Sequence, residues 1–576
     1  MAVSLLALAT GLGFQGSRGL YETTEGRYAE VAREMVATAD YLTPRLDAEA
    51  HWTKPPLAYW AIAGGLRLRA DEWGARLSGA LAFFLTVLAV ATIGGTLWGE
   101  ATGIAAGLVY ATSLFPVAAA NTVNADTLLT LWEVAAVLCY VRAVWRPGDR
   151  QVPARRWILA MWAAFGLGFL TKGPPALLPL LAVVVWNRRR ARLFHPAGLL
   201  LFLLIGLGWY GVQSSRHPEL LPYLVGQEVI ARNLTSTFHR SPQWWKPFTL
   251  YVPLLALGGG LWSYWSWRAA LGRRLYRPSV LWRRFRGDGP GAFLLAWLLL
   301  PLVVFFLSRS RMPLYVLPLY APVALATGRT LAPPGTRAAR RWVWTLGLLT
   351  ATGLAVLKSV AAGREDYRDM RRLSEQVRSV AGPPREPSVD EGAAGLRVYA
   401  YEQEKLFGLE YYLGGRIRRV SASGAEPWAD ASLQSALREI HAAHETAARE
   451  ADAHKAREAD AHEAHEAGDP RGIGPGEAAE RGRGDAARAD TTRLPPAVLL
   501  SRSSDGDALR SAAAAAGLSL RCAERATWVA CGVRPADRPA GSRSFRHGST
   551  RRTRRSLRPP PPIGPGATRR GSSTRF

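Results

Sequence analysis

The amino-acid sequence predicts a polytopic α-helical membrane protein, with about 11 transmembrane helices, that ends in a small extracytoplasmic α/β domain. Two observations lead to this fold class. Up to about residue 361 the chain consists mostly of long apolar runs rich in Leu, Ala, Val and Trp, and beyond it the chain is polar, charged and partly repetitive. The mean hydropathy of −0.01 therefore averages two unlike halves.

The composition excludes several classes of protein. Three cysteines in 576 residues are too few for a disulfide scaffold or a metal cluster built from cysteines. The sequence lacks a Gly-rich phosphate loop of the Walker type, which argues against that class of ATPase. The 72 Lys and Arg against 45 Asp and Glu give a net charge of +27, which would suit nucleic acid. The placement of the arginines favours another explanation.

Eleven apolar segments of the first half are predicted to cross the bilayer, which takes about 20 apolar residues each. The first is short and begins at Met1, so it is either a signal peptide that lacks a small-residue cleavage site or the product of a start codon placed too late. The predicted spans are 2–14, 76–97, 101–119, 127–145, 157–171, 174–187, 197–212, 248–267, 291–307, 313–328 and 342–361.

Four connecting segments carry clusters of arginine, and an eleven-span topology places all four on one side of the membrane. The positive-inside rule makes that side cytoplasmic, so the clusters set the topology and bind anionic lipids rather than nucleic acid. The same topology places 15–75, 213–247 and everything after Ala361 outside. The clusters lie at Arg146–Arg156, Arg188–Arg192, Arg268–Arg286 and Arg329–Arg341.

Two features stand out in the first outer segment, 15–75. Residues 24–36 have apolar side chains at helical spacing, from Tyr28 to Met35, and we expect an amphipathic helix in the membrane interface. Lys54 directly precedes two prolines, which fix the local backbone and so aim the side chain. A cation here suits a lipid phosphate, and the alternative is a lysine that extends to the membrane surface among tryptophans.

Asp126 lies on the outer side, between the third and fourth predicted spans. A carboxylate at that depth is costly unless it is used or paired. Asp is also a good helix N-cap. The sequence leaves both interpretations open.

Seven short motifs follow one another in order along the first 360 residues. They are Glu25-Gly26-Arg27-Tyr28-Ala29-Glu30, Leu42-Thr43-Pro44, Lys54-Pro55-Pro56-Leu57, Arg76-Leu77-Ser78, Asn124-Ala125-Asp126, Thr171-Lys172-Gly173-Pro174 and the segment from Ser308 to Pro318. This series resembles the superfamily of lipid A aminoarabinose transferases and protein O-mannosyltransferases. The resemblance implies the GT-C fold and transfer of a sugar from a polyprenyl-phosphate donor to a lipid, glycan or protein acceptor at the outer face.

Such a transfer needs a base for the acceptor hydroxyl and cations for the leaving phosphate. We predict Glu25 and Asp126 as the base and its partner. Lys172, at an outer turn, is expected to be structural. The predicted donor-phosphate site comprises Lys54, Arg27, Arg311 and Tyr315, and His239 and Arg240 either line the acceptor path or are ordinary loop residues.

The chain departs from the family pattern at several positions. Family members often carry an acid at the position of Thr24 and a glutamate at the position of Thr53. Where the family binds a metal ion, that glutamate is implicated, so no metal ligand is assigned here and metal dependence stays open. Arg309 and Arg311 replace lysines and add the bidentate geometry of a guanidinium.

Two alternatives to an active enzyme remain. One is a transporter or flippase of lipid-linked sugars. The other is a catalytically inactive relative, which the replacement of family acids by Thr24 and Thr53 would favour. A transporter places ionisable residues near the midplane of the bilayer. The acids Glu25, Glu30 and Asp126 lie instead at the outer ends of spans, which favours an enzyme.

The domain organisation predicted from these patterns has three parts, with the transmembrane domain at 1–361. An extracytoplasmic α/β domain follows at 362–534, with a low-complexity insertion at about 425–495, and a disordered basic tail at 535–576. The strands of this α/β domain are expected at 396–401, 416–420, 497–500 and 528–533, and its helices at 404–413 and 505–516. Cys522 and Cys531 form a disulfide or remain two thiols, and the histidines of the insertion are either a metal-binding tract or part of a solvated helix.

Overall fold

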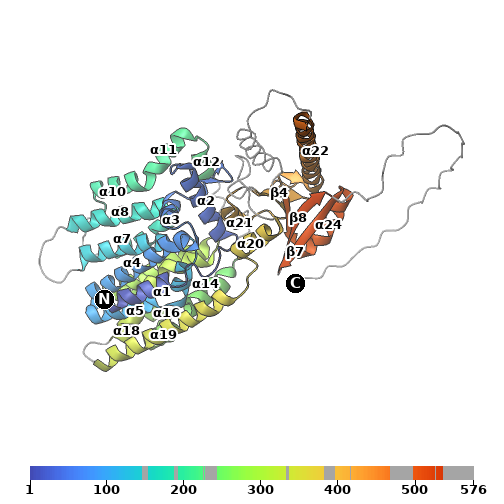
Figure 1. Cartoon of the computed structure of the whole chain (residues 1–576). Helices are drawn as coiled ribbons and strands as arrows, with labels where there is room; N and C mark the ends of the chain where they lie inside the picture. Colours follow the sequence, from blue (N-terminus) through green and yellow to red (C-terminus); the bar gives the residue numbers. More distant parts are fainter. Residues whose placement is uncertain are drawn as a thin grey trace, which may run out of the picture. The chain divides into compact units, whose positions relative to one another are not determined.

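The computed structural model describes residues 1–145, 154–186, 193–224, 226, 243–287, 289–332, 337–381, 396–415, 417–466, 497–525 and 527–535. Residues 1–535 form one compact unit. Within it, a bundle of helices formed by the first part of the chain adjoins a mixed sheet formed by the last part (Figure 1).

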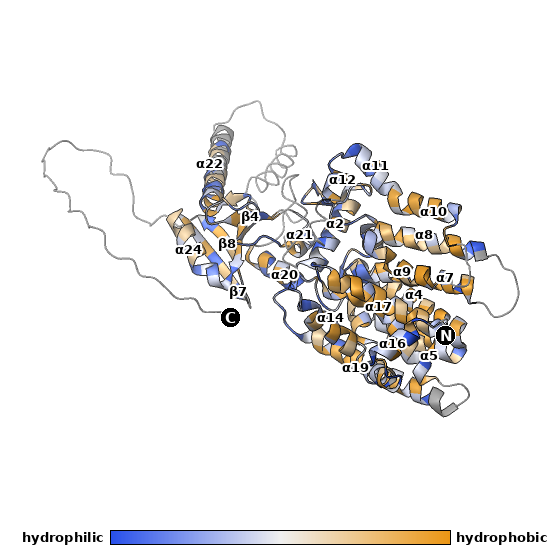
Figure 2. Ribbon diagram, turned by 180° about the vertical axis from the view of Figure 1, so that it is seen from behind, coloured by the Kyte–Doolittle hydropathy of each residue, from blue (hydrophilic) through white to orange (hydrophobic). Residues whose placement is uncertain are grey.

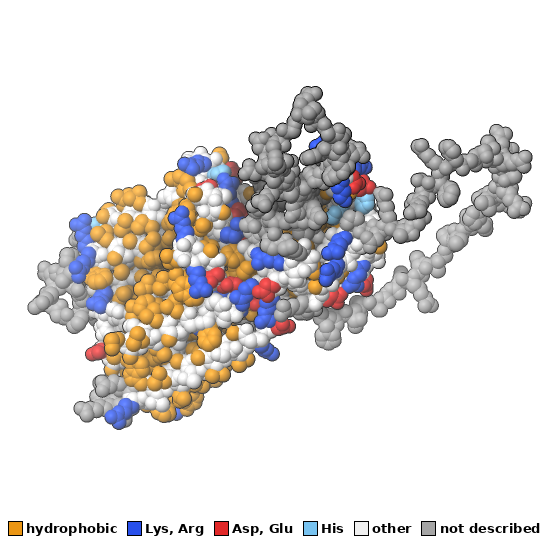
Figure 3. Space-filling model, viewed as in Figure 1, with side chains coloured by type: hydrophobic (Ala, Val, Ile, Leu, Met, Phe, Trp, Pro, Cys, Tyr) orange, Lys and Arg blue, Asp and Glu red, His pale blue; other side chains and the backbone are white. Residues whose placement is uncertain are grey.

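On the face shown in Figure 3, hydrophobic side chains make up much of the surface of the bundle, while Lys and Arg lie mainly toward its ends and over the sheet region. Seen from behind, the ribbon of the bundle helices is likewise mostly hydrophobic by residue hydropathy (Figure 2). This is the distribution expected of a polytopic membrane protein. Its helices are α1 (Ala2–Leu12), α4 (Glu72–Trp98), α5 (Glu100–Ala111), α6 (Leu114–Ala120), α7 (Asp126–Val144), α8 (Ala154–Lys172), α9 (Leu178–Val185), α10 (Pro196–Phe202), α11 (Gly208–Arg216), α12 (Leu220–Tyr223), α14 (Lys246–Leu257), α15 (Trp262–Gly272), α16 (Pro278–Phe285), α17 (Pro290–Leu307), α18 (Tyr320–Leu331) and α19 (Arg337–Gly363).

Five helical segments of the described chain are long and apolar enough to cross a membrane, and six if α5 and α6, bent by 60°, count as one span. The eleven predicted spans all coincide with helical structure, but their number stays a prediction because several are shorter or broken. The span predicted at 248–267 comprises α14 and α15. The break lies at Gly258, where a Cβ atom would stand 2.0 Å from the hydroxyl of Tyr320, so a side chain does not fit.

The helix ends that adjoin three of the four arginine clusters, those at 188–192, 268–286 and 329–341, meet at one end of the bundle. Trp186, after α9, donates its indole N–H to the carbonyl of Gly287 at 3.0 Å. At the end of α18, Arg329 lies 4.9 Å from the ring centroid of Trp98. The following residue, Thr330, accepts a hydrogen bond from Arg273 at 3.1 Å. The predicted placement of these segments on a common side therefore agrees with the packing.

The first outer segment folds into helix α2 (Thr24–Thr38), a small hairpin of β1 (Arg45–Leu46) and β2 (Glu49–Ala50), and helix α3 (Leu57–Leu68). Helix α2 forms where the sequence predicts it, its place at the membrane interface stays a prediction, and its acidic face is not left to solvent. Glu25, Gly26 and Glu30 are buried along with the apolar face. The reason is tertiary, because α3 covers one side of α2 and helix α21 (Phe407–Leu413) covers another.

The last part of the chain forms a six-stranded sheet in the order β5-β4-β3-β6-β8-β7, parallel from β5 to β6 and antiparallel at β8 and β7. Helices α20 (Met370–Ala381) and α21 cover one face, and α22 (Leu433–Glu466) and α24 (Gly506–Ala515) cover the other. The strands are β3 (Arg397–Tyr401), β4 (Arg418–Ser421), β5 (Ala431–Ser432), β6 (Ala497–Arg502), β7 (Leu518–Arg525) and β8 (Trp528–Pro535).

Three details of this region go beyond the sequence expectations. Strand β7 and helix α20 have no counterpart among the predicted elements. Helix α22 runs through the first half of the predicted low-complexity insertion, and only its beginning, up to Ile440, packs on the sheet. Cys522 and Cys531, opposite each other on β7 and β8, form a disulfide with a Cα–Cα separation of 4.0 Å, which settles the pairing that the sequence left open.

Candidate functional site

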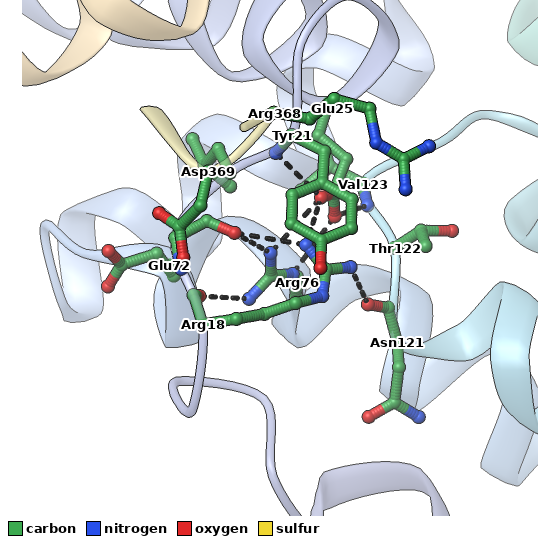
Figure 4. A network of polar contacts seen from close by, with 12 residues as sticks. Arg18, Tyr21, Glu25, Glu72, Arg76, Asn121, Thr122, Val123, Arg368 and Asp369 are labelled. Atoms are coloured by element: carbon green, nitrogen blue, oxygen red, sulfur yellow. Dashed lines mark hydrogen bonds and ion pairs between the residues drawn. The ribbon is translucent and has the colours of Figure 1, made fainter. Parts of the chain in front are cut away.

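Glu25 lies in the first turn of α2 and is surrounded by donors (Figure 4). Its Oε1 accepts hydrogen bonds from Arg76 Nε at 3.0 Å and from the backbone N–H of Val123 at 2.9 Å. Its Oε2 accepts from Arg18 at 2.5 Å, from the backbone N–H of Tyr21 at 3.0 Å and from Arg76 Nη2 at 3.2 Å. One carboxylate therefore ties together the chain before α2, helix α4 and the segment that leads to α7.

Arg76 completes this assembly from α4, where its side chain is 1% exposed. Besides Glu25 it binds three backbone carbonyls, those of Gln15 at 2.5 Å, Arg18 at 3.0 Å and Gly19 at 2.9 Å. Burial alone would raise the pKa of Glu25, but the charges of Arg76 and Arg18 outweigh it and lower the pKa to about 2. The geometry thus argues against the predicted role of Glu25 as a base, because its lone pairs are already occupied.

Asp126 begins α7, but it does not cap the helix. Asn124 Oδ1 accepts the hydrogen bond from the backbone N–H of Thr127 at 2.9 Å, and the Asn124 amide donates to the carbonyl of Ala119 at 2.8 Å. The side chain of Asp126 instead forms a buried ion pair with Lys172, the last residue of α8. Asn124, not Asp126, therefore accepts the hydrogen bond from the first turn of α7, and Asp126 presents a carboxylate to the interior.

Lys172 is the residue that the sequence reasoning undervalued, since it was expected to be structural. Its Nζ lies over the ring of Tyr315 at 4.6 Å from the centroid, in addition to its contact with Asp126. Tyr28 on α2 lies close to the Asp126–Lys172 pair. Burial raises the pKa of its hydroxyl, the charges of Arg27 and Lys172 lower this pKa, and the charge of Asp126 raises it. Glu133, two turns along α7 from Asp126, is also buried, at 4% exposure.

Two cations predicted to hold phosphate lie near one another in the first outer segment. Burial, together with the positive charges of Arg27 and Lys54, lowers the pKa of His51 to about 4. The imidazole is thus neutral at physiological pH, and its Nε2 is buried without a hydrogen-bond partner among the described residues. Lys54 donates to the carbonyl of Thr53 at 2.8 Å, which directs the ammonium along the loop.

The remaining predicted residues separate into three groups. Tyr315 belongs to the Asp126–Lys172 cluster. Arg311 is 4% exposed and donates to the backbone carbonyls of Gln243 at 2.9 Å and Phe306 at 3.2 Å, so it braces the backbone and is poorly placed for phosphate. His239 and Arg240 lie outside the described residues.

The described residues contain no group of three or more His, Cys, Asp or Glu side chains that is arranged to hold a metal ion. At the two positions where the family pattern has acids, Thr24 and Thr53 offer hydroxyl groups, which are weaker ligands for hard divalent cations.

Known proteins match both the sequence and the fold of this chain. The family model described as dolichyl-phosphate-mannose-protein mannosyltransferase matches residues 53–209. The crystal structure of ArnT from Cupriavidus metallidurans bound to undecaprenyl phosphate superposes with a TM-score of 0.66 at 19% identity, covering 92% of this chain and 97% of that chain. The apo state gives 0.64 at 20% identity, with the same coverage. The chain thus has the fold of ArnT, and residues 53–209 are similar in sequence to the mannosyltransferase family.

Curated proteins similar to this chain include undecaprenyl phosphate-α-4-amino-4-deoxy-L-arabinose arabinosyl transferases. The chain is 32% identical over 345 residues to one from Pseudomonas fluorescens, and the aligned region covers 57% of this chain and 59% of that protein. It is 31% identical over 342 residues to one from Pseudomonas aeruginosa, with the same shares. The matched region thus spans about three fifths of the length of these relatives.

Proposed function

We propose that this chain is an integral-membrane glycosyltransferase that moves a sugar from a polyprenyl-phosphate donor to a membrane lipid, glycan or protein acceptor at the outer face of the cytoplasmic membrane. The observation that carries the proposal is the buried Asp126–Lys172 pair, with Tyr315 beside it and with Tyr28 near enough to feel the charges of this pair and of Arg27. The names of the matched relatives, which act on undecaprenyl-phosphate aminoarabinose, support the donor class.

In the proposed reaction, a hydroxyl oxygen of the acceptor forms a bond to the anomeric carbon as the bond from that carbon to the phosphate oxygen breaks. Asp126 accepts the hydroxyl proton, and its ion pair with Lys172 orients this carboxylate. Lys54 and Arg27 neutralise the phosphate as its charge develops. Glu25 acts by position, because it fixes the segment 121–123 that precedes Asp126.

Replacing Lys54 by Ala is expected to raise the KM for the donor about tenfold with a smaller effect on kcat, since a cation contact to phosphate exists before the transition state as well as in it. Lys54→Arg restores little, because a planar fork replaces a point charge. Lys246→Ala serves as the control, since Lys246 is also a cation beside a tryptophan ring, at 4.7 Å from Trp245. Kinetics of sugar transfer at matched membrane abundance measure the effect, and an unchanged KM in Lys54→Ala would remove this residue from the donor site.

We further propose that the arginine-rich ends face the cytoplasm, where they bind anionic lipids, and that the sheet region is extracytoplasmic. The common location of the helix ends next to three of the four basic clusters supports this orientation. A reporter active only in the cytoplasm should be silent when it is fused after about residue 370 and active when it is inserted between residues 146 and 153. A bright signal from the first fusion would contradict the orientation.

One observation favours the alternative of a transporter or flippase for lipid-linked sugars. Glu133 is a carboxyl group buried within a candidate membrane span, and such groups are typical of transport pathways. Membranes supplied with a radiolabelled polyprenyl-phosphate sugar distinguish the two functions. A glycosyltransferase converts the donor to a labelled acceptor and free polyprenyl phosphate, whereas a flippase moves the intact donor across the bilayer.

A further inference from the structure

Helix α21 of the sheet region makes close contacts with the first outer segment. The backbone N–H of Gly408 donates to Glu22 Oε2 at 2.6 Å. A Cβ atom on Gly26 would lie 2.3 Å from the nitrogen of Gly408, so the backbones of α2 and α21 touch. This close approach requires glycine at position 26. At Gly408 a Cβ atom would lie 2.7 Å from Met370 Cγ on α20 and 3.0 Å from Glu22 Oε2, so a side chain is not accommodated there either.

Tyr412 on α21 joins two further segments with a single hydroxyl. It accepts a hydrogen bond from the backbone N–H of Leu20 at 2.8 Å and donates to Glu72 Oε1 at 2.6 Å. Glu72 is the first residue of α4, one turn before Arg76. The adjacent linker residue, Gly19, donates its N–H to Asp369 at 3.1 Å. The short linker between α1 and α2 is thus held by the sheet region.

The same linker is bound from its other side by the Glu25–Arg76 pair. Arg76 donates to the carbonyl of Gly19 at 2.9 Å, and Glu25 accepts from the N–H groups of Tyr21 at 3.0 Å and Val123 at 2.9 Å. Val123 precedes Asp126 by three residues. A continuous series of hydrogen bonds therefore runs from Tyr412 through the linker and Glu25 to the segment 121–126.

We infer that helix α21 is a positioning element of the proposed active site, in which Gly408 and Tyr412 hold the first outer segment and, through Glu25, the backbone that presents Asp126. The inference rests on the proposed function where it takes Asp126 as the reacting carboxylate. Tyr412 is a positioning residue, and it acts on kcat through the placement of Asp126. It also gives the sheet region a role in the reaction.

Hydrogen–deuterium exchange on the purified full chain tests the inference in the variants Tyr412→Phe, Tyr411→Phe and Gly408→Ala. Tyr411 is the matched control, because it is buried next to Tyr412 in the same apolar cluster and its hydroxyl makes no hydrogen bond with the described residues. Loss of the Tyr412 hydroxyl leaves Leu20 N–H and Glu72 without their partner, and removal of such a buried bond accelerates local exchange about tenfold. The diagnostic segment is 121–126, which is reached through Glu25.

We expect faster exchange in 121–126 for Tyr412→Phe and Gly408→Ala, with unchanged protection in β6 and no effect of Tyr411→Phe. Unchanged exchange of 121–126 in both Tyr412→Phe and Gly408→Ala would overturn the inference. Equal loss of protection in β6 would overturn it too, because the helix would then act on the stability of the sheet. In membranes, Tyr412→Phe should lower kcat with an unchanged donor KM. If the wild-type chain consumes no undecaprenyl-phosphate aminoarabinose or other polyprenyl-phosphate sugar, the proposed function fails, while the exchange result still decides the role of α21.

Discussion

Replacing Asp126 by Asn lowers sugar transfer by about 10²–10⁴-fold while the protein remains in the membrane at normal abundance, if Asp126 is the carboxylate that accepts the proton. Asn keeps the size of the side chain and one acceptor oxygen, so the change removes the charge and the basicity. Lys172 then loses its counter-charge, although it keeps its contact with the ring of Tyr315. Transfer of label from a polyprenyl-phosphate sugar, measured at matched abundance, gives the result.

The control for this substitution is Asp71→Asn. Asp71 is the N-cap of α4 and accepts from the backbone N–H of Gly74 at 3.1 Å, and Asn caps a helix about as well as Asp. We expect this variant to be nearly silent. The double variant Asp126→Asn, Lys172→Gln should be no less active than Asp126→Asn alone, because a pair that works as a unit is lost with its first member. Full activity in Asp126→Asn would exclude a catalytic role for this carboxylate.

The second large effect concerns stability, and it is expected for Arg76→Met. This change removes one partner of a buried ion pair, takes the Arg76 donor from the carbonyls of Gln15 and Arg18, and leaves the carbonyl of Gly19 with its hydrogen bond from Arg18 alone. Breaking such a pair typically costs about 3–5 kcal/mol, so we expect a large fall in the melting temperature and in membrane abundance. Arg371→Met is the matched control, since Arg371 is 34% exposed, lies 3.4 Å from Glu72 and should contribute about 1 kcal/mol or less.

The pH dependence of stability provides a second measurement of the same pair. The pKa of Glu25 lies at about 2 in the folded protein against an ordinary value of 4.5, because burial is outweighed by Arg76 and Arg18. The charged form therefore stabilises the fold above pH 4.5, and this contribution is lost as the pH falls toward 2. Glu25→Gln should be less stable than wild type at pH 6 and should lack this acid-dependent component. A pH 6 melting temperature equal to that of wild type in both Arg76→Met and Glu25→Gln would contradict the structural role of the pair.

Much of the candidate site was accessible from local pattern. Helix α2 follows from apolar side chains at helical spacing. Asp126 was identified because a carboxylate at the end of an apolar run is energetically costly unless it is paired or takes part in function. Lys172 was undervalued because its partner lies 46 residues away. The sequence did contain a signal for this pair, because Asp126 and Lys172 lie at the outer ends of two consecutive predicted spans. At that depth each charge is costly without the other.

The sequence by itself determined the membrane-embedded helical class, because this follows from length and hydropathy along the chain. From the placement of charge it also predicted a common side for the arginine-rich segments and an outer location for the ionisable motifs. Tertiary structure decided the roles of individual side chains. Glu25 and Asp126 are similar as carboxylates in a sequence. Arg76, Arg18 and two backbone N–H groups occupy the first, whereas Lys172 and Tyr315 surround the second. The difference arises because pairing between distant segments sets which lone pairs stay available for chemistry.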